Sequence, residues 1–232
     1  LKAGLGTEKV CLMVLRGADT AGQKHLIALR EGYRESADSW GGLLADCTKR
    51  GLNEPACWIG DGNLGLWVAI DRQSPHAAPQ RCTNHKTMNV VDKLPKTERP
   101  EAIQRLRAIW QSDSPKVARQ MAEKWIRDVR QAGYDRAADC LEKDLDRCLT
   151  FYQFPEGHGS HLRTSHPIES IFGPVRLRTT AARRFQKTQS GVWRVHQVID
   201  RLSKRWRRLC SAHLCGTVPL PGRQENAAVH AA

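Results

Sequence analysis

The chain has 232 residues, of which 40% are hydrophobic and 26% are charged, a composition typical of a globular protein with one domain or two small ones. Its formal net charge of +13 at pH 7 indicates a polyanion partner, most often nucleic acid. No apolar run reaches the roughly 18 residues that a membrane helix needs, and the first residues lack a signal-peptide pattern, so we expect a cytoplasmic protein without a membrane partner.

Residues 10–16 and 24–30 are short apolar runs separated by the turn-forming sequence Asp-Thr-Ala-Gly, a pattern that predicts a β-hairpin. Ser36 is a suitable cap for a following helix with apolar residues at helical spacing, and Gly51 is suited to end it. The pattern then predicts a buried strand, a helix and a short strand, at residues 56–60, 64–72 and 80–82. Together these elements indicate an α/β sheet layer.

After Asn84 no strand signal returns. Apolar residues recur every three or four positions in three stretches, which predicts helices at residues 103–110, 117–129 and 137–148. The pair Ser114-Pro115 is a start signal for the second of them. We interpret residues 92–164 as an all-helical insertion whose apolar stripes form its core.

The surplus positive charge is concentrated near the C-terminus. Residues 163–208 hold twelve Lys and Arg against two acids, whereas residues 1–162 hold 24 against 21. A solvated helix face is one interpretation, but a run so strongly of one sign favours contact with nucleic-acid phosphates. Apolar residues between 192 and 209 predict a basic amphipathic helix, and residues 210–232 have the composition of a frayed tail. The expected phosphate contacts are Arg176, Arg178, Arg183, Arg184, Lys187, Arg201, Lys204, Arg205 and Arg208.

Glu169 is the first candidate for chemistry. It lies in the first turn of a predicted helix that Pro167 opens, and Arg176, seven positions on, would share a face with it. The alternative is that this acid is simply favoured by the helix dipole. Gly173-Pro174 lies just beyond, so the helix that carries Glu169 should kink or end early.

Asp61 is the second candidate, because it follows a predicted strand and α/β sheets present functional side chains where strands end. A plain Asp-Gly turn is the alternative. The surrounding sequence Gly-Asp-Gly-Asn-Leu-Gly also matches a dinucleotide-binding pattern. We reject that interpretation because no acid closes the next strand about 20 residues on.

Cys82 and His85 form a Cys-x-x-His pair, which is half of a zinc site, and His158, His161 and His166 are candidate partners. The spacing is weak evidence, so we expect a buried thiol and a hydrogen-bonded histidine that support the site, and we do not expect zinc. The other cysteines are scattered through a chain without a secretory pattern, which indicates reduced thiols.

Four sequence motifs follow one another along the chain and together identify its resemblance to a family: IGDGNLGLW at 59–67, QRCTNHKTMNV at 80–90, LPK at 94–96 and HPIES at 166–170. With them, the chain closely resembles the Mutator-type transposases of bacterial insertion sequences. The resemblance implies a ribonuclease H-like fold, a mixed sheet flanked by helices and interrupted by a helical insertion. Its core would comprise residues 1–91 and 165–209, with the insertion at 92–164 and a tail at 210–232.

The resemblance also implies an Asp, Asp, Glu triad that binds two Mg²⁺ ions, with Mn²⁺ as an alternative. Asp61 would be the second acid and Glu169 the third, with Cys82 and His85 in a structural role near the site. The implied reaction is hydrolysis of a DNA phosphodiester and transfer of the 3′-hydroxyl to target DNA. The implied partners are transposon ends, target DNA and further copies of the chain.

The chain departs from the family pattern at one important point. The family's first acid lies on a strand just upstream of the sequence that here begins Leu1-Lys2-Ala3-Gly4. We therefore expect the first catalytic strand to be missing and the chain to be inactive alone. The alternative is a non-catalytic DNA-binding or dimerising remnant that modulates intact transposases.

Overall fold

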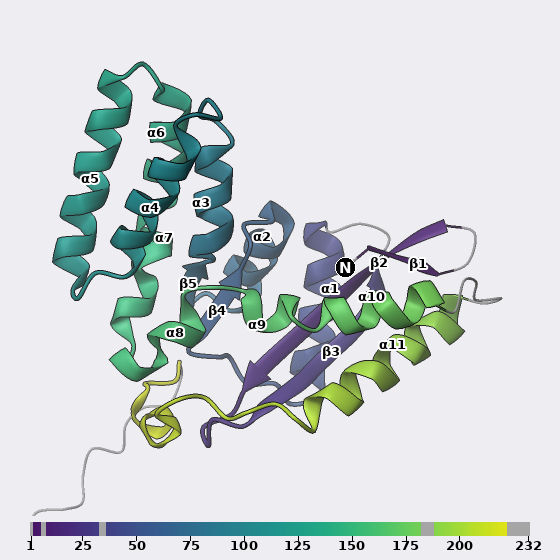
Figure 1. The fold of residues 1–232 in the computed structure, drawn as a ribbon. Coiled ribbons are helices and arrows are strands. Elements are labelled where there is room, and N and C mark those ends of the chain that lie inside the picture. Colours follow the sequence, from purple (N-terminus) through teal and green to yellow (C-terminus); the bar gives the residue numbers. More distant parts are fainter. Residues whose placement is uncertain (1, 6–7, 33–35, 182–187, 222–232) are drawn as a thin grey trace, which may run out of the picture.

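The computed structural model describes residues 2–5, 8–32, 36–181 and 188–221, which form a mixed α/β structure (Figure 1). One sheet is antiparallel, in the order β1-β2-β3, and the other is a parallel pair of β4 and β5. The strands are β1 (Lys2–Leu5), β2 (Glu8–Ala18), β3 (Lys24–Gly32), β4 (Cys57–Gly60) and β5 (Ala78–Arg81). The predicted α/β class is confirmed.

The predicted hairpin is formed by β2 and β3. Its turn is built as the sequence indicated, because the Asp19 carboxylate accepts hydrogen bonds from the N–H groups of Ala21 and Gln23. Gly22 adopts a φ of 73°, which a glycine tolerates without strain. The strand register shifts between Leu15 and Arg16.

Helices α1 (Ala37–Lys49) and α2 (Leu64–Gln73) confirm the next predictions. The Ser36 hydroxyl accepts from the Ser39 N–H at the start of α1, and Gly51, with a φ of 96°, follows its end.

Strand β2 is buried on both faces, because helices cover the sheet from both sides. Met13 and Leu15 pack into a core with α1 and α2, whereas Leu12 and Val14 pack into a second core with the C-terminal helices. Alternation along a strand sends neighbouring side chains to opposite faces, so one apolar run serves both cores.

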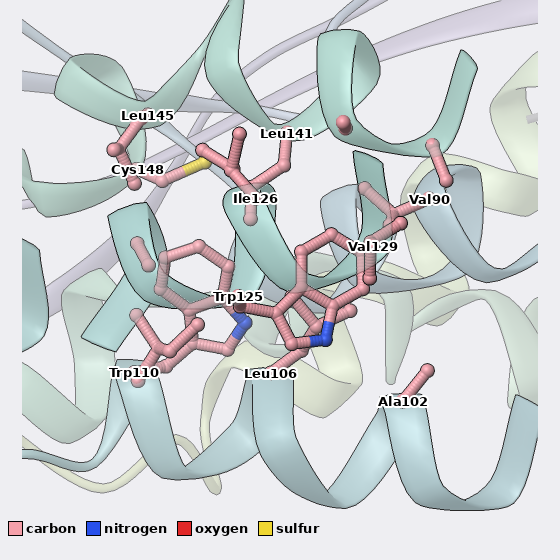
Figure 2. Close-up of a cluster of buried hydrophobic side chains, with 14 of the residues drawn as sticks. Val90, Ala102, Leu106, Trp110, Trp125, Ile126, Val129, Leu141, Leu145 and Cys148 are labelled. Atoms are coloured by element: carbon pink, nitrogen blue, oxygen red, sulfur yellow. The ribbon is translucent and has the colours of Figure 1, made fainter. Parts of the chain in front are cut away.

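A separate helical lobe has its own core (Figure 2). It is built by α3 (Thr83–Val91), α4 (Arg99–Trp110), α5 (Pro115–Gln131), α6 (Asp135–Glu142) and α7 (Leu145–Leu149). Ser114 caps α5 and Pro115 opens it, as predicted. The buried amide of Gln80 fastens this lobe to β5, since it donates to the Cys148 carbonyl and accepts from the Phe151 N–H.

Two details of the lobe differ from the prediction. Helix α3 had no predicted counterpart, because its buried face carries the polar residues Thr83, Lys86 and Thr87 and therefore shows no clear apolar stripe. The third predicted helix is two helices, α6 and α7, because the backbone of Asp144 leaves the helical conformation between them.

The segment after α7 contains short elements and two longer helices. They are the 3₁₀ turns η1 (Thr150–Gln153) and η2 (Glu156–His158), α8 (Gly159–Leu162), α9 (His166–Glu169), α10 (Phe172–Ala181), α11 (Thr188–Ser203) and η3 (Ala212–Thr217). Helix α9 ends after one turn, as expected from Gly173-Pro174, and Pro174 lies in the first turn of α10, where its missing N–H is tolerated. Glu169 and Arg176 therefore lie on different helices, which corrects the expectation that one helix presents both.

Two further expectations for the C-terminus are wrong. The basic helix ends at Ser203, so Arg205 and Arg208 lie beyond it. Residues 210–221 are not a frayed tail, because Cys215 is buried within η3 and the Leu209 N–H donates to the Gly22 carbonyl just before it. Residues 222–232 lie outside the described residues. Among the described helices, none combines the length and apolar character that a membrane crossing demands.

We predict that Leu106→Ala lowers the free energy of unfolding by about 2–5 kcal/mol, because Leu106 is fully buried in the helical lobe and truncation leaves a cavity. Leu64→Ala is the matched control. Leu64 is 74% exposed, so the same truncation should change the free energy by less than about 0.5 kcal/mol. Urea denaturation followed by circular dichroism measures both, and equal effects would contradict the assigned core.

Candidate active site

The loop before α9 is fastened to the N-terminus of α3. The N–H and the hydroxyl of Thr83 both donate to the Arg163 carbonyl, at 2.9 and 3.0 Å. The Ser165 N–H donates to the Cys82 Sγ at 3.3 Å, and the Arg16 guanidinium donates to the Pro167 carbonyl. The bonds to α3 join residues 80 and 83 positions apart, and the bond from Arg16 joins residues 151 positions apart. Together they hold α9 against both α3 and β2.

This attachment brings four side chains together. The Cys82 Sγ lies 3.3 Å from the His85 Nδ1, which lies 3.5 Å from Glu169 Oε1. The Ser165 hydroxyl is 3.3 Å from the same nitrogen and donates to Glu169 Oε1. Cys82 is fully buried, whereas His85 and Glu169 are about one third exposed, so the cluster opens to solvent on the Glu169 side.

The cluster shifts the acidity of its members. Burial alone would raise the pKa of the Cys82 thiol, but hydrogen bonds with His85 and Ser165 outweigh it and lower the pKa to about 7. The pKa of His85 is raised, first by its hydrogen bond with Cys82 and then by the negative charges of Cys82, Glu169 and Asp61. The two groups therefore favour a thiolate beside an imidazolium.

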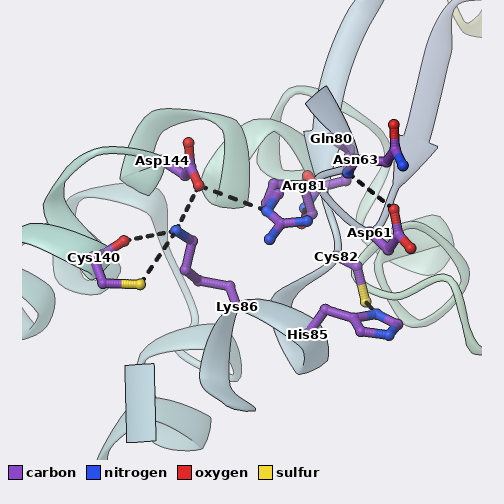
Figure 3. Close-up of polar contacts among 9 residues, drawn as sticks. All are labelled: Asp61, Asn63, Gln80, Arg81, Cys82, His85, Lys86, Cys140 and Asp144. Carbon is purple, nitrogen blue, oxygen red and sulfur yellow. Dashed lines mark hydrogen bonds and ion pairs between the residues drawn. The ribbon is translucent and has the colours of Figure 1, made fainter. Parts of the chain in front are cut away.

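Asp61 follows the last residue of β4, as the sequence predicted. Its Oδ1 accepts from the Asn63 N–H at 3.1 Å, and Asn63 in turn caps α2 by accepting from the Leu66 N–H. The negative charges of Glu169 and Asp61 raise the pKa of His85 as smaller causes than its hydrogen bond with Cys82. Figure 3 shows Asp61 on the side of α3 that carries Cys82 and His85.

A buried charge network lies behind the Asp61 loop (Figure 3). The Arg81 guanidinium lies against Gly62, where an added Cβ would approach it to 1.8 Å. The Asp144 carboxylate lies 2.5 Å from the Lys86 Nζ and 3.6 Å from the Arg81 Nε, and Lys86 also donates to the Cys140 carbonyl at 2.6 Å. One acid from the helical lobe thus partners two buried cations beside the site.

Sequence reasoning missed this network. Arg81 was treated only as the end of a strand, and Asp144 interrupts an apolar stripe that was interpreted as one helix. The charged Asp144 in the middle of an apolar stripe is the sequence signal from which this network could have been predicted, because a charge near a hydrophobic core needs a partner.

Residues 3–209 match the model of the Mutator family of transposases. The chain is 40% identical over 218 residues to the transposase for insertion sequence element IS6120 of Mycolicibacterium smegmatis, a match that covers 94% of this chain and 67% of that protein. It is 37% identical over 199 residues to the transposase for insertion sequence element IST2 of Acidithiobacillus ferrooxidans, covering 85% and 67%. The chain belongs to the Mutator transposase family.

In this Mutator-family chain, the histidines once considered as partners of Cys82 do not join it in the described structure. His158 Nε2 lies 3.2 Å from the Ser211 carbonyl and 3.7 Å from the Cys215 Sγ. His161 Nε2 accepts from the Cys210 N–H, and His166 lines a nearby pocket. None of these three candidate partners joins the Cys82–His85 pair; Glu169 of α9 does.

The predicted phosphate contacts can be placed only in part. Arg176, Arg178, Arg201, Lys204, Arg205 and Arg208 are exposed, and Arg183, Arg184 and Lys187 lie outside the described residues. Lys204 pairs with Asp200 at 3.6 Å, and the Arg208 Nε donates to the Gln23 side chain at 3.4 Å. A pocket of about 350 Å³ beside α3 adds Arg107 and Arg163 to the basic groups near the site.

The side chains of Asp61 and Glu169 are of the kind that binds a divalent metal ion. Asp61 and Glu169 offer carboxylate oxygens, the donors that Mg²⁺ and Mn²⁺ prefer, and both carboxylates are accessible to solvent. Glu169 is already oriented by Ser165 and His85, as ligating carboxylates commonly are.

We predict that Gly62→Ala destabilises this transposase-family chain more than Gly133→Ala does. Both glycines have a positive φ, 93° and 84°, so both variants carry backbone strain of about 1–2 kcal/mol. Only at Gly62 does the new Cβ meet a buried side chain, that of Arg81, which should add about 1–3 kcal/mol. Urea denaturation measures the free energy of unfolding of both variants. Equal decreases would mean that Arg81 does not constrain the loop.

We also predict that Cys82 titrates near pH 7 in metal-free protein, so that about half of it is thiolate there. His85→Asn should raise this pKa to 9 or above, leaving about 1% thiolate or less at pH 7. The variant loses the hydrogen bond from His85 that lowers the pKa, whereas the burial that raises it remains. The thiolate absorbance in the ultraviolet, taken as the difference from Cys82→Ser in the presence of a chelator, measures it. An unshifted pKa in His85→Asn would contradict the proposed pairing.

Proposed function

We propose that this chain forms the greater part of a transposase catalytic core, in which Asp61 and Glu169 bind a divalent metal ion and the basic C-terminal segment binds DNA. The observation that carries this proposal is the convergence of the two acids. They come from segments more than a hundred positions apart, yet both lie beside the Cys82–His85 segment: Asp61 directly follows Gly60, whose carbonyl accepts from the Cys82 N–H at 2.8 Å, and Glu169 Oε1 lies 3.5 Å from His85 Nδ1. Relatives described as insertion sequence transposases supply the reaction class.

The strand arrangement supports a ribonuclease H-like core. An antiparallel set β1-β2-β3 is followed in the chain by a parallel pair β4-β5, with helices on both faces of the larger sheet. The described strands form two separate sheets, and we propose that they correspond to the two parts of one mixed sheet. Asp61 follows the end of β4, the position at which such sheets present functional groups.

Each side chain has a definite role in the proposed site. Asp61 and Glu169 would hold the metal, with Mg²⁺ first and Mn²⁺ as a substitute. The metal supplies charge neutralisation at the phosphate and activation of the attacking oxygen. Ser165 and His85 fix the orientation of the Glu169 carboxylate, and Cys82 fixes that of His85. The exposed arginines of α10 and α11 would contact DNA phosphates, which positions the duplex without reading its sequence.

The described residues supply two acids, whereas the family resemblance implies three. In the part of the chain that the structure describes, the one group of three or more metal-ligating side chains is Cys82, His85 and Glu169, and Glu169 is its only carboxylate. We therefore propose that residues 1–232 alone bind DNA without cutting it, and that cleavage of transposon ends and strand transfer need a third acid. We further propose that the active form contains several copies of the chain, as the family resemblance implies.

A chimeric transposase tests the roles of the two acids. This chain would replace the matching two thirds of the Mycolicibacterium smegmatis relative, which supplies the rest of the protein. We predict that Asp61→Asn and Glu169→Gln each reduce cleavage of a transposon end by at least about 100-fold while leaving DNA binding unchanged.

The matched controls are Asp113→Asn and Glu123→Gln, which alter exposed carboxylates of the helical lobe. Both should cleave at the parent rate. Retained cleavage in Asp61→Asn or Glu169→Gln would remove that residue from the metal site, and loss of DNA binding in either would make it structural.

Salt dependence tests the basic segment. We predict that the logarithm of the DNA affinity falls linearly with the logarithm of the salt concentration, with a slope of about −0.9 for each phosphate neutralised. Arg201→Ala with Arg205→Ala should flatten the slope by about 2 units, since both side chains are exposed on or just beyond α11.

Arg119→Ala with Arg127→Ala removes the same charge from α5 in the helical lobe and should leave the slope unchanged. Fluorescence anisotropy with a labelled duplex at several salt concentrations measures both pairs. Equal slopes in the two double variants would contradict the assignment.

A further inference from the structure

We propose that Cys82, His85 and Glu169 form a binding site for a soft divalent metal ion, with Zn²⁺ as its natural occupant. In the part of the chain that the structure describes, this is the one place where three such donor groups meet, with their ligand atoms within 4.8 Å of one another. This site differs in donor chemistry from the pair of carboxylates that would hold Mg²⁺. Zinc binding as such requires neither DNA nor catalysis.

The separations of the donor atoms fit a tetrahedral zinc ion. Zinc binds thiolate sulfur at about 2.3 Å and imidazole nitrogen or carboxylate oxygen at about 2.0–2.2 Å, so tetrahedral angles place neighbouring ligand atoms about 3.3–3.6 Å apart. The Cys82 Sγ to His85 Nδ1 distance is 3.3 Å, and the His85 Nδ1 to Glu169 Oε1 distance is 3.5 Å. These two edges of the tetrahedron are therefore already in place.

The backbone keeps the three donors in this position. Cys82 directly follows β5, and its N–H donates to the Gly60 carbonyl of β4 at 2.8 Å. His85 lies in the first turn of α3, three positions on. Glu169 is held on α9 by the contacts of Thr83, Ser165 and Arg16 described above. Because the ligands are carried by helices and adjoin a strand, the site is preorganised, and metal binding does not first have to order its ligands.

A fourth ligand is at hand. The Ser165 hydroxyl lies 3.3 Å from His85 Nδ1 and contacts Glu169, and solvent reaches the site where His85 and Glu169 are 37% and 34% exposed. Water or this hydroxyl would complete the coordination. Three protein ligands with one exchangeable position are typical of accessible zinc sites.

The donor set selects zinc over the harder ions. Thiolate and imidazole are preferred by Zn²⁺, whereas Mg²⁺ and Ca²⁺ favour oxygen ligands alone. The chain contains a useful comparison in Cys215 and His158, whose Sγ and Nε2 lie 3.7 Å apart. No third His, Cys, Asp or Glu ligand completes that pair among the described residues. A cysteine close to a histidine is therefore not enough to form a metal site. The Cys82–His85 pair differs in having Glu169 as a third ligand.

Zinc at this site would engage Glu169, which the proposed function assigns to the catalytic metal. Resting on that proposed function, bound zinc would withdraw Glu169 from Mg²⁺ and hold the site in an inactive state. From the sequence alone we expected no zinc, because the spacing of the Cys-x-x-His pair is weak evidence for a site. Glu169 is 84 positions from His85, and only the folded chain brings it to the pair.

Metal titration of the purified 232-residue chain tests the site. After removal of metal with a chelator, Co²⁺ is added as a spectroscopic probe and then displaced with Zn²⁺. We expect one Co²⁺ per chain with tetrahedral absorption bands and a thiolate-to-cobalt charge-transfer band, both removed by one equivalent of Zn²⁺. Cys82→Ser should abolish the charge-transfer band, whereas His85→Asn and Glu169→Gln should weaken Zn²⁺ binding by at least about 10-fold.

Cys215→Ser is the matched control and should leave the spectrum unchanged. Circular dichroism reports whether each variant folds, and the partly exposed His85 and Glu169 keep the test decisive where the buried Cys82→Ser does not fold. A charge-transfer band that survives in folded Cys82→Ser, or one that Cys215→Ser removes, would overturn the proposal, as would zinc affinity unaffected by both His85→Asn and Glu169→Gln.

Asp61→Asn separates this proposal from the proposed function. It should leave Zn²⁺ binding intact, because Asp61 is not a ligand of the proposed zinc site, while it reduces cleavage by the chimeric transposase. Zinc binding with catalysis unaffected by Asp61→Asn would refute only the catalytic assignment. Reduced catalysis in a chain that binds no zinc would refute only the zinc site.

Discussion

The structure depends on the attachment of one loop to one helix terminus. Thr83 donates twice to the Arg163 carbonyl, and Ser165 donates to the thiol of Cys82. The first of these bonds satisfies the Thr83 N–H, one of the backbone donors at the start of α3 that the helix itself leaves unpaired. Because Glu169 lies one turn beyond this attachment, the bonds that begin α3 also place the carboxylate beside His85.

The helical lobe is part of the same arrangement. Asp144 reaches from the lobe to Lys86 and Arg81, and Gln80 bonds to the backbone of Cys148 and Phe151. Arg81 in turn lies against Gly62, next to Asp61. A charge buried without a partner is strongly unfavourable, so removal of Asp144 would disturb the Asp61 loop as well as the lobe. The Asp144 carboxylate thus connects the packing of the helical lobe to the position of the Asp61 loop.

The sequence predicted those elements whose local signals agree with their packing. The hairpin, the caps at Ser36 and Ser114 and the position of Asp61 after β4 all follow from turn residues, capping residues and apolar period, and the structure confirms them. The break between Glu169 and α10 followed from Gly173-Pro174. In each case a few adjacent residues determine the backbone conformation.

Features that depend on distant partners were not predictable in this way. Helix α3 buries Thr83, Lys86 and Thr87, whose burial is favourable only because partners come from Arg163, Asp144 and Trp110. The extension of the basic helix to residue 209 was wrong because Trp206 is held by Arg16, which stacks 3.8 Å above its ring, and not by a further helical turn. The proximity of Glu169 to Cys82 likewise exists only in the folded chain.

The central claim is that Asp61 and Glu169 face one metal site. Anomalous diffraction from crystals of this chain soaked in Mn²⁺, with zinc excluded, measures this directly. The account predicts a Mn²⁺ peak within coordinating distance, about 2.0–2.3 Å, of a carboxylate oxygen of each residue. Carboxylates that point to opposite sides of the molecule, or a peak that contacts neither, would contradict it.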